Sequence, residues 1–96
     1  MTEHSRVTVI INKISLFSSV VEEVKNIDPI IAKFILRHCV WGENGSLIKT
    51  RKWLKEGIES NGILLDNEGD MYYFNVDKLK RVFGLFDKYE KIYIKL

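Results

Sequence analysis

The sequence is poor in the residues that disulfide scaffolds, metal cages and membrane spans need. Its 96 residues include one cysteine and one proline, and they contain no glutamine at all. A single cysteine excludes an internal disulfide and a cysteine-based zinc site. No apolar run approaches the ~18 residues that cross a bilayer, and the polar first residues are unlike a signal peptide. We therefore expect a soluble, intracellular and cytoplasmic protein with no membrane partner.

The charge is small and balanced. Lys and Arg together number 15 against 13 Asp and Glu, which leaves a net charge of +2, and 46% of the residues are hydrophobic. This hydrophobic share is too high for a disordered chain, and the charge is too low for a histone-like coat on DNA. The length fits a single domain, 1–96, in which we expect residues 1–5 to be disordered.

The composition is biased in one direction. Twelve Ile and eleven Lys accompany a single Ala, Ala32. Enrichment in Ile and Lys with loss of Gln is the trend of hyperthermophile proteomes, although six Asn also fit the codon bias of an AT-rich genome. The composition resembles that of small proteins from thermophilic archaea or their viruses.

The pattern of apolar residues predicts eight elements. Residues 6–12 are β-branched and predict a strand, and apolar residues three and four apart predict a helix from about Ser15 to Ile27. Asp28 and Pro29 end that helix and begin a second one, which extends to about Val40. A glycine-rich turn precedes a third helix over about 46–60. A hairpin of strands 63–65 and 71–74 follows, then a fourth helix over 76–89 and a final strand over 91–96.

Residues 47–75 resemble part of a known family. Trp53-Leu54, Ile58, Asn61-Gly62-Ile63-Leu64 and Met71-Tyr72-Tyr73-Phe74 are similar to the third helix and wing of winged-helix domains. The resemblance implies an α+β fold: a single small winged-helix-like domain of order β-α-α-α-β-β-α-β, with the N- and C-terminal strands flanking it. It also implies that the third helix enters the major groove of double-stranded DNA.

The first hypothesis is therefore a DNA-binding transcription or replication factor that acts as a monomer or a dimer. The residues that would contact DNA are the basic ones of the third and fourth helices: Lys49, Arg51, Lys52, Lys55, Lys78, Lys80 and Arg81. The same basic residues also fit an ordinary solvated helix face, since Lys52–Glu56 and Lys55–Glu59 are spaced to form ion pairs within the helix.

The alternative hypothesis is a protein-interaction module of the same fold, as a small subunit of a replication or transcription complex, a viral inhibitor of a host complex, or a homodimer. The tip of the hairpin carries Asp66, Glu68 and Asp70 and no basic residue, so a phosphate backbone would repel it. Tyr72 and Tyr73 alternate along a strand, which places one of them toward solvent. These five residues are the candidates for contact with a protein.

Nothing in the sequence indicates an enzyme, a cofactor or a small-molecule substrate. His38 and Cys39 are neighbours on a helix, so their side chains diverge by about 100° and cannot act as a base and a nucleophile together. The carboxylates of the hairpin tip superficially resemble the start of a calcium loop. The sixth and twelfth positions of such a loop would be Met71 and Asp77 instead of Gly and Glu, so we expect no metal site.

Overall fold

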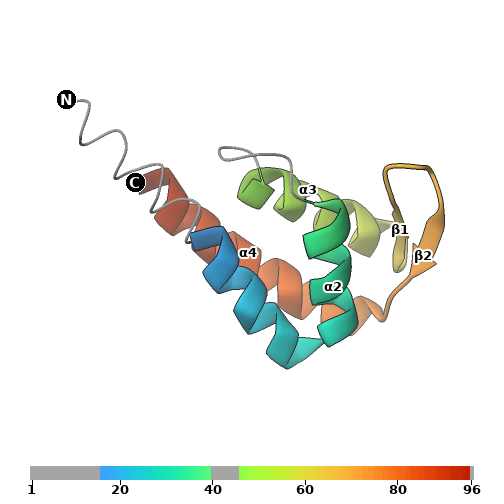
Figure 1. The fold of residues 1–96 in the computed structure, drawn as a ribbon, viewed down its shortest axis with the longest axis horizontal. Helices are drawn as coiled ribbons and strands as arrows, with labels where there is room; N and C mark the ends of the chain where they lie inside the picture. The colour runs from blue at the N-terminus through green and yellow to red at the C-terminus, as the bar shows by residue number, and fades with distance from the viewer. Residues whose placement is uncertain (1–15, 40–45, 96) are drawn as a thin grey trace.

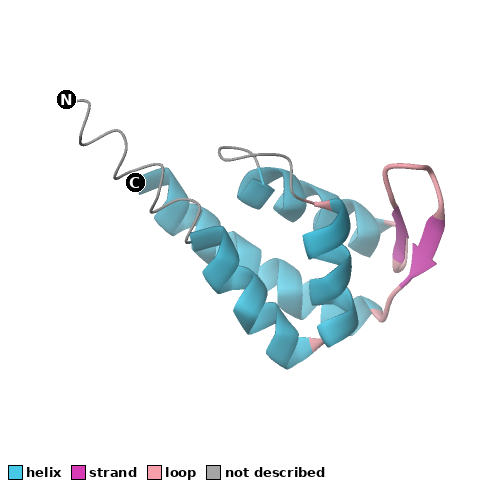
Figure 2. Ribbon diagram, viewed as in Figure 1, coloured by secondary structure: helices cyan, strands magenta, loops and turns pink. Residues whose placement is uncertain are grey.

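A computed structural model describes residues 16–39 and 46–95 of the chain. Residues 16–27 are helical, and they are followed by α2 (Pro29–His38), α3 (Ser46–Glu59), β1 (Ile63–Leu65), β2 (Met71–Tyr73) and α4 (Val76–Lys95). The helix over 16–27 runs alongside α4 in the opposite direction, and α2 begins at the end of that helix and turns away from it (Figure 1). The hairpin extends from one end of this helical body (Figure 2). None of the described helices is long and apolar enough to cross a membrane.

The junction between the first helix and α2 confirms the prediction at Asp28 and Pro29. The backbone of Asp28 is extended, and its Oδ1 accepts hydrogen bonds from the N–H of Ile30 at 2.8 Å and of Ile31 at 3.4 Å. Pro29 occupies the first turn, where a missing N–H costs nothing. The direction of α2 is thus fixed by two adjacent residues.

The end of α3 aims the hairpin. The N–H of Gly62 donates to the carbonyl of Gly57 at 2.8 Å, and the N–H of Asn61 donates to Ile58 at 3.1 Å. Asn61 and Gly62 both have positive φ, 58° and 97°. This pair of bonds is the Schellman arrangement, which satisfies the last carbonyls of a helix and turns the chain sharply. The sequence predicted this stop correctly.

One core joins all the helices to β1. Helix 16–27 contributes three valines, α2 its Ile31 and Ile35, and α4 a stripe at helical spacing. The fully buried residues of this core include Val20, Val24, Ile31, Ile35, Cys39, Leu54, Leu79, Val82 and Phe86. Leu64 of β1 is also buried there and lies against Gly57 of α3, so that one hairpin residue anchors the sheet to the helices.

The predicted fold class is wrong at its C-terminal end. The order β-α-α-α-β-β-α-β ends in a strand over 91–96, but α4 continues to Lys95. Within the described residues the order is α-α-α-β-β-α, and the hairpin holds the only two strands. The alternation of Lys91, Ile92, Tyr93 and Ile94 suggested a strand. Instead Tyr93 is buried two helical turns beyond Phe86, while Ile94 is 70% exposed, as the 3.6-residue period of a helix requires.

The remaining predictions either concern residues outside the described part of the chain or differ from the structure in detail. The strand over 6–12, the disorder of residues 1–5 and the turn over 41–45 lie outside the described residues, as does Val40 at the predicted end of the second helix. Ile30 of α2 is 69% exposed, although it is a large apolar residue. Because α2 starts at Pro29, Ile30 lies on the first turn and points beside the core instead of into it.

Candidate functional site

Three of the four basic residues predicted on the third helix lie free on the surface of α3. Lys49, Lys52 and Lys55 are exposed, and none of them forms an ion pair or a hydrogen bond within the described chain. The predicted pairs with Glu56 and Glu59 are not formed. These three ammonium groups are therefore available to an anionic partner.

Arg51, the fourth, faces α4. Its Nη2 lies 2.8 Å from Oδ1 of Asp87, and its Nε lies 2.9 Å from Oε2 of Glu90. The guanidinium also lies over the ring of Phe83, 4.9 Å from its centre. These contacts join α3 to α4 and occupy the charge that the DNA hypothesis assigned to a phosphate or a base. Asp87 is 36 residues away in sequence and Glu90 lies three residues further on, so no local pattern indicated either partner.

We expect Arg51→Met to lower the free energy of unfolding by about 1–3 kcal/mol, because Asp87 and Glu90 would lose their shared cation while half-buried. Lys52→Met is the matched control on the exposed side of α3 and should change stability by no more than about 0.5 kcal/mol. Urea titration followed by circular dichroism measures both. Equal effects of the two substitutions would show that Arg51 has no structural role.

The second predicted basic cluster, which consists of Lys78, Lys80 and Arg81, contains one paired residue and two free ones. Lys78 pairs with the capping residue Asp28, with 3.7 Å between Nζ and Oδ2, and so ties the start of α4 to the start of α2. Lys80 and Arg81 are exposed and unpaired within the described residues. Two of the three residues therefore remain free for a partner.

The hairpin presents an apolar face to solvent. In the antiparallel register Ile63 faces Tyr73 and Leu65 faces Met71, and these four side chains share the side opposite to buried Leu64. Leu65 is 53% exposed, Met71 58% and Tyr73 72%. Trp53 of α3 continues this surface beside β1, and its Nε1 donates to the carbonyl of Leu65 at 3.3 Å.

The outer edge of β2 is open. The N–H of Phe74 donates to the carbonyl of Gly62, and the N–H of Asp66 donates to that of Asp70. Because hydrogen-bonded pairs alternate with non-bonded pairs in an antiparallel ladder, Leu64 and Tyr72, which lie midway between these two, form the next hydrogen-bonded pair. The N–H and C=O groups of Met71 and Tyr73 therefore point away from β1. Within the described chain nothing forms a hydrogen bond with them.

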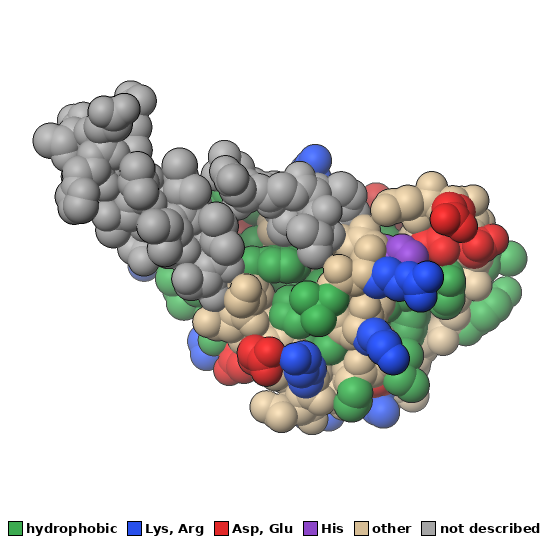
Figure 3. All heavy atoms as spheres, in the orientation of Figure 1, with side chains coloured by type: hydrophobic (Ala, Val, Ile, Leu, Met, Phe, Trp, Pro, Cys, Tyr) green, Lys and Arg blue, Asp and Glu red, His purple; other side chains and the backbone are tan. Residues whose placement is uncertain are grey.

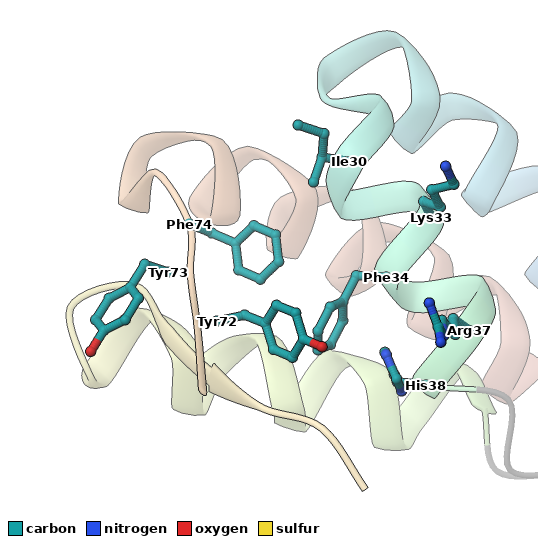
Figure 4. A pocket seen from close by; sticks show the side chains of 8 residues that line it. All are labelled: Ile30, Lys33, Phe34, Arg37, His38, Tyr72, Tyr73 and Phe74. Atoms are coloured by element: carbon teal, nitrogen blue, oxygen red, sulfur yellow. The ribbon is translucent and has the colours of Figure 1, made fainter. Parts of the chain in front are cut away.

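A hollow of about 240 Å³ lies between β2 and α2. Its lining comes from Ile30, Lys33, Phe34, Arg37, His38, Tyr72, Tyr73 and Phe74. Tyr72 and Phe74 point toward α2, and Tyr73 points to the other side of the strand (Figure 4). Phe34 forms the floor: its ring centre is 4.9 Å from those of Trp53 and Tyr72 and 5.3 Å from that of Phe74.

The rim of the hollow is basic on the side of α2. Lys33 and Arg37 are exposed one helical turn apart, and neither has an ion-pair partner among the described residues. Acidic, basic and histidine side chains gather at the hairpin end of this face (Figure 3). The side chain of His38 is half-buried against Phe34, at 4.6 Å between ring centres.

The acidic tip is a hydrogen-bonded turn. Oδ1 of Asp66 accepts from the N–H groups of Glu68 and Asp70, each at 2.9 Å, and Gly69 has a left-handed backbone, with φ of 85°. Carboxylate oxygens of Asp66, Glu68 and Asp70 lie within 4.8 Å of one another. The turn geometry accounts for their proximity, because Asp66 closes the loop with these two bonds.

We expect the turn to loosen in acid. Burial raises the pKa of Asp66, but bonds from the N–H groups of Asp70 and Glu68 and from the Tyr72 hydroxyl outweigh it, so the net pKa is lowered from 3.8. The ionised Asp66 carboxylate therefore stabilises the turn fully above the pKa that Asp66 has in the unfolded chain. This stabilisation is lost as the pH falls through the lower pKa that Asp66 has in the folded chain. The protection of the Glu68 and Asp70 amides against hydrogen exchange, relative to their intrinsic rates at each pH, should fall over this range, and Asp66→Asn, which does not titrate, should abolish this pH dependence.

Cys39 is not a nucleophile. It is fully buried, and burial raises the pKa of its thiol to about 12 in spite of a hydrogen bond with Thr50. A thiolate is the reactive form, so this thiol is inert at neutral pH.

Sequence reasoning found part of the hairpin surface and missed the hollow. It identified Tyr72, Tyr73 and the acidic tip, but it gave Phe34, Lys33 and Arg37 no part in binding. The signal that could have found them is the spacing of Lys33 and Arg37, which places two cations in one row beside exposed Ile30. Their position opposite β2 depends on tertiary structure. No family model, no curated protein and no solved structure matches this chain.

Proposed function

We propose that this protein is an interaction module that binds another protein through its β-hairpin. The observation that carries the proposal is the solvent-facing side of the hairpin, where Leu65, Met71 and Tyr73 are each more than half exposed. Contiguous exposed apolar side chains are one of the features that mark interaction sites on protein surfaces.

The surroundings of the hairpin support a protein partner over a nucleic acid. Aromatic residues and Met are enriched in protein interfaces, and the hairpin supplies Met71 and Tyr73. The tip next to them carries three carboxylates, which a phosphate backbone would meet with repulsion. Leu64 and the turn at Gly62 hold the hairpin on the helices, so it is presented as a rigid element.

The test is capture of a partner by the intact chain from cells that naturally make it, compared with a Leu65→Ser, Met71→Ser, Tyr73→Ser variant. We expect a protein retained by the wild-type chain and lost with the variant, and the purified pair should bind in calorimetry with the same dependence. Lys49→Ser, Lys52→Ser, Lys55→Ser is the matched control and should keep the partner. Capture that is the same with all three chains would contradict the proposal.

A second candidate is binding of double-stranded DNA through α3, as the winged-helix resemblance implies. It is favoured by the three unpaired lysines, Lys49, Lys52 and Lys55, on one exposed helix. Arg51, already paired with α4, and the acidic tip count against it. Binding to a mixed duplex pool at two salt concentrations tests it: this candidate requires affinity that falls steeply with salt and is abolished by Lys52→Glu. No binding at low salt would eliminate it.

A further inference from the structure

We propose that the edge of β2 binds an extended segment of the partner protein as a third strand. This segment carries an acidic side chain into the groove that the hollow forms between β2 and α2. This inference rests on the proposed function and specifies the form of the partner. An open strand edge beside a lined groove is the arrangement in which peptides bind by strand addition, with the backbone giving affinity and the groove giving selectivity.

The backbone of β2 sets the conformation of the ligand. Met71 and Tyr73 direct two N–H and two C=O groups away from β1, and these match the donors and acceptors of a single extended strand. The opposite edge is less open, because Trp53 already donates to Leu65. An added strand therefore belongs on the β2 side, where an unpaired edge would otherwise be a liability.

The groove sets the side chains of the ligand. Residues of the added strand that point the same way as Tyr72 and Phe74 enter the hollow over Phe34, which is apolar at its floor. At the rim they meet Lys33 and Arg37, which have no partner in the described chain. The complementary segment has an apolar residue and an Asp or Glu two positions apart, since alternate residues of a strand share a face.

Two other occupants fit less well. A second copy, paired two-fold through β2, would bring the same basic rim from both chains to one interface, and like charges there oppose association. A single-stranded nucleic acid could stack on the aromatic residues and neutralise the rim. However, it carries a phosphate at every nucleotide and would extend past Asp66, Glu68 and Asp70, whereas a peptide can place its carboxylate at the rim alone.

The experiment uses a displayed library of random linear peptides, selected on the full chain. We expect enrichment of extended sequences with an acidic residue two positions from an apolar one. The selected peptide, synthesised and labelled, should shift the amide resonances of Met71 and Tyr73. N-methylation of its backbone amides that face β2 should weaken binding at least about tenfold, because lost strand hydrogen bonds are not replaced.

The variants separate the edge from the groove. Tyr73→Pro removes one outward N–H and should weaken binding about tenfold relative to Tyr73→Ala, which keeps it. Lys33→Glu with Arg37→Glu should abolish binding of the acidic peptide and create binding of the same peptide with Lys in place of its acidic residue.

Three results with the peptide or nucleic-acid probes would overturn the inference. They are a library that yields no binder, a binder that tolerates both Tyr73→Pro and the charge reversal, or an oligo(dT) probe that binds the groove and is lost with Arg37→Glu. A chain that dimerises in sedimentation and loses the dimer with Tyr73→Pro would also overturn it, in favour of a second copy. In each case the proposed function still stands if a partner protein is captured through Leu65, Met71 and Tyr73. If no partner depends on these three residues, the proposed function and the strand-addition inference are both wrong.

Discussion

Phe86→Ala is expected to lower the free energy of unfolding by about 3–5 kcal/mol, which is a large part of the total for a domain of this size. Phe86 is fully buried at the centre of α4, and its ring lies edge-on to that of Phe17, with 6.4 Å between the ring centres. Removal of the ring takes away the contact between α4 and the helix over 16–27 and leaves a cavity that the surrounding valines cannot fill. Urea titration followed by circular dichroism measures the loss.

The control for this substitution lies on the same helix. Ile94 is 70% exposed, so Ile94→Ala should change stability by no more than about 0.5 kcal/mol, whereas Tyr93→Ala, at a buried position, should cost several times more. This contrast also tests the helical continuation of α4 to Lys95. Comparable losses at positions 93 and 94 would contradict the burial pattern of the helix.

Gly62→Ala is expected to cost about 2–4 kcal/mol and to release the hairpin from the helices. Gly62 has a φ of 97°, and a Cβ there would collide with the carbonyl oxygen of Phe74, which is backbone and cannot move aside. The hydrogen bond from the N–H of Phe74 to Gly62, at 2.8 Å, begins the pairing of the two strands. The alanine therefore strains the turn and the sheet together.

Asn61→Gly is the matched control, because residue 61 also has positive φ but glycine adopts that conformation without strain. It should leave stability unchanged or raise it slightly. Hydrogen exchange should show faster exchange of the Tyr72 and Leu64 amides in Gly62→Ala, with the helix over 16–27 less affected. Unchanged protection of these two amides would contradict the role given to the turn.

The sequence predicted the parts of the fold that depend on neighbouring residues. Asp28 with Pro29 marks a cap because one side chain and one ring act on the next two residues, and Asn61 with Gly62 marks a stop for an equally local reason. The hairpin itself was also predicted, since two apolar, strand-like segments flank a polar turn that contains Gly69. The C-terminal strand over 91–96 was wrong because so short a pattern of charged and apolar residues fits the period of a helix as well as that of a strand, and the packing of Tyr93 decided between them.

The candidate site was predictable only in part, because it is built from distant segments. Tyr72 and Tyr73 are noticeable in the sequence as adjacent aromatics on a strand. The pairing of Arg51 with Asp87 and the position of α2 opposite β2 arise from helix packing, which no local spacing encodes. The acidic tip was correctly read as a turn, yet its hydrogen bonds through Asp66 emerge only from the folded loop.

Site-specific photo-crosslinking tests the central claim most directly. A benzophenone side chain in place of Tyr73 would sample the exposed face of the hairpin, and the same group in place of Lys52 would sample α3, each in the intact chain within cells that make it. We predict a protein adduct from position 73 and no specific adduct from position 52. DNA adducts from position 52, without a protein adduct from position 73, would contradict the account and favour the DNA-binding alternative.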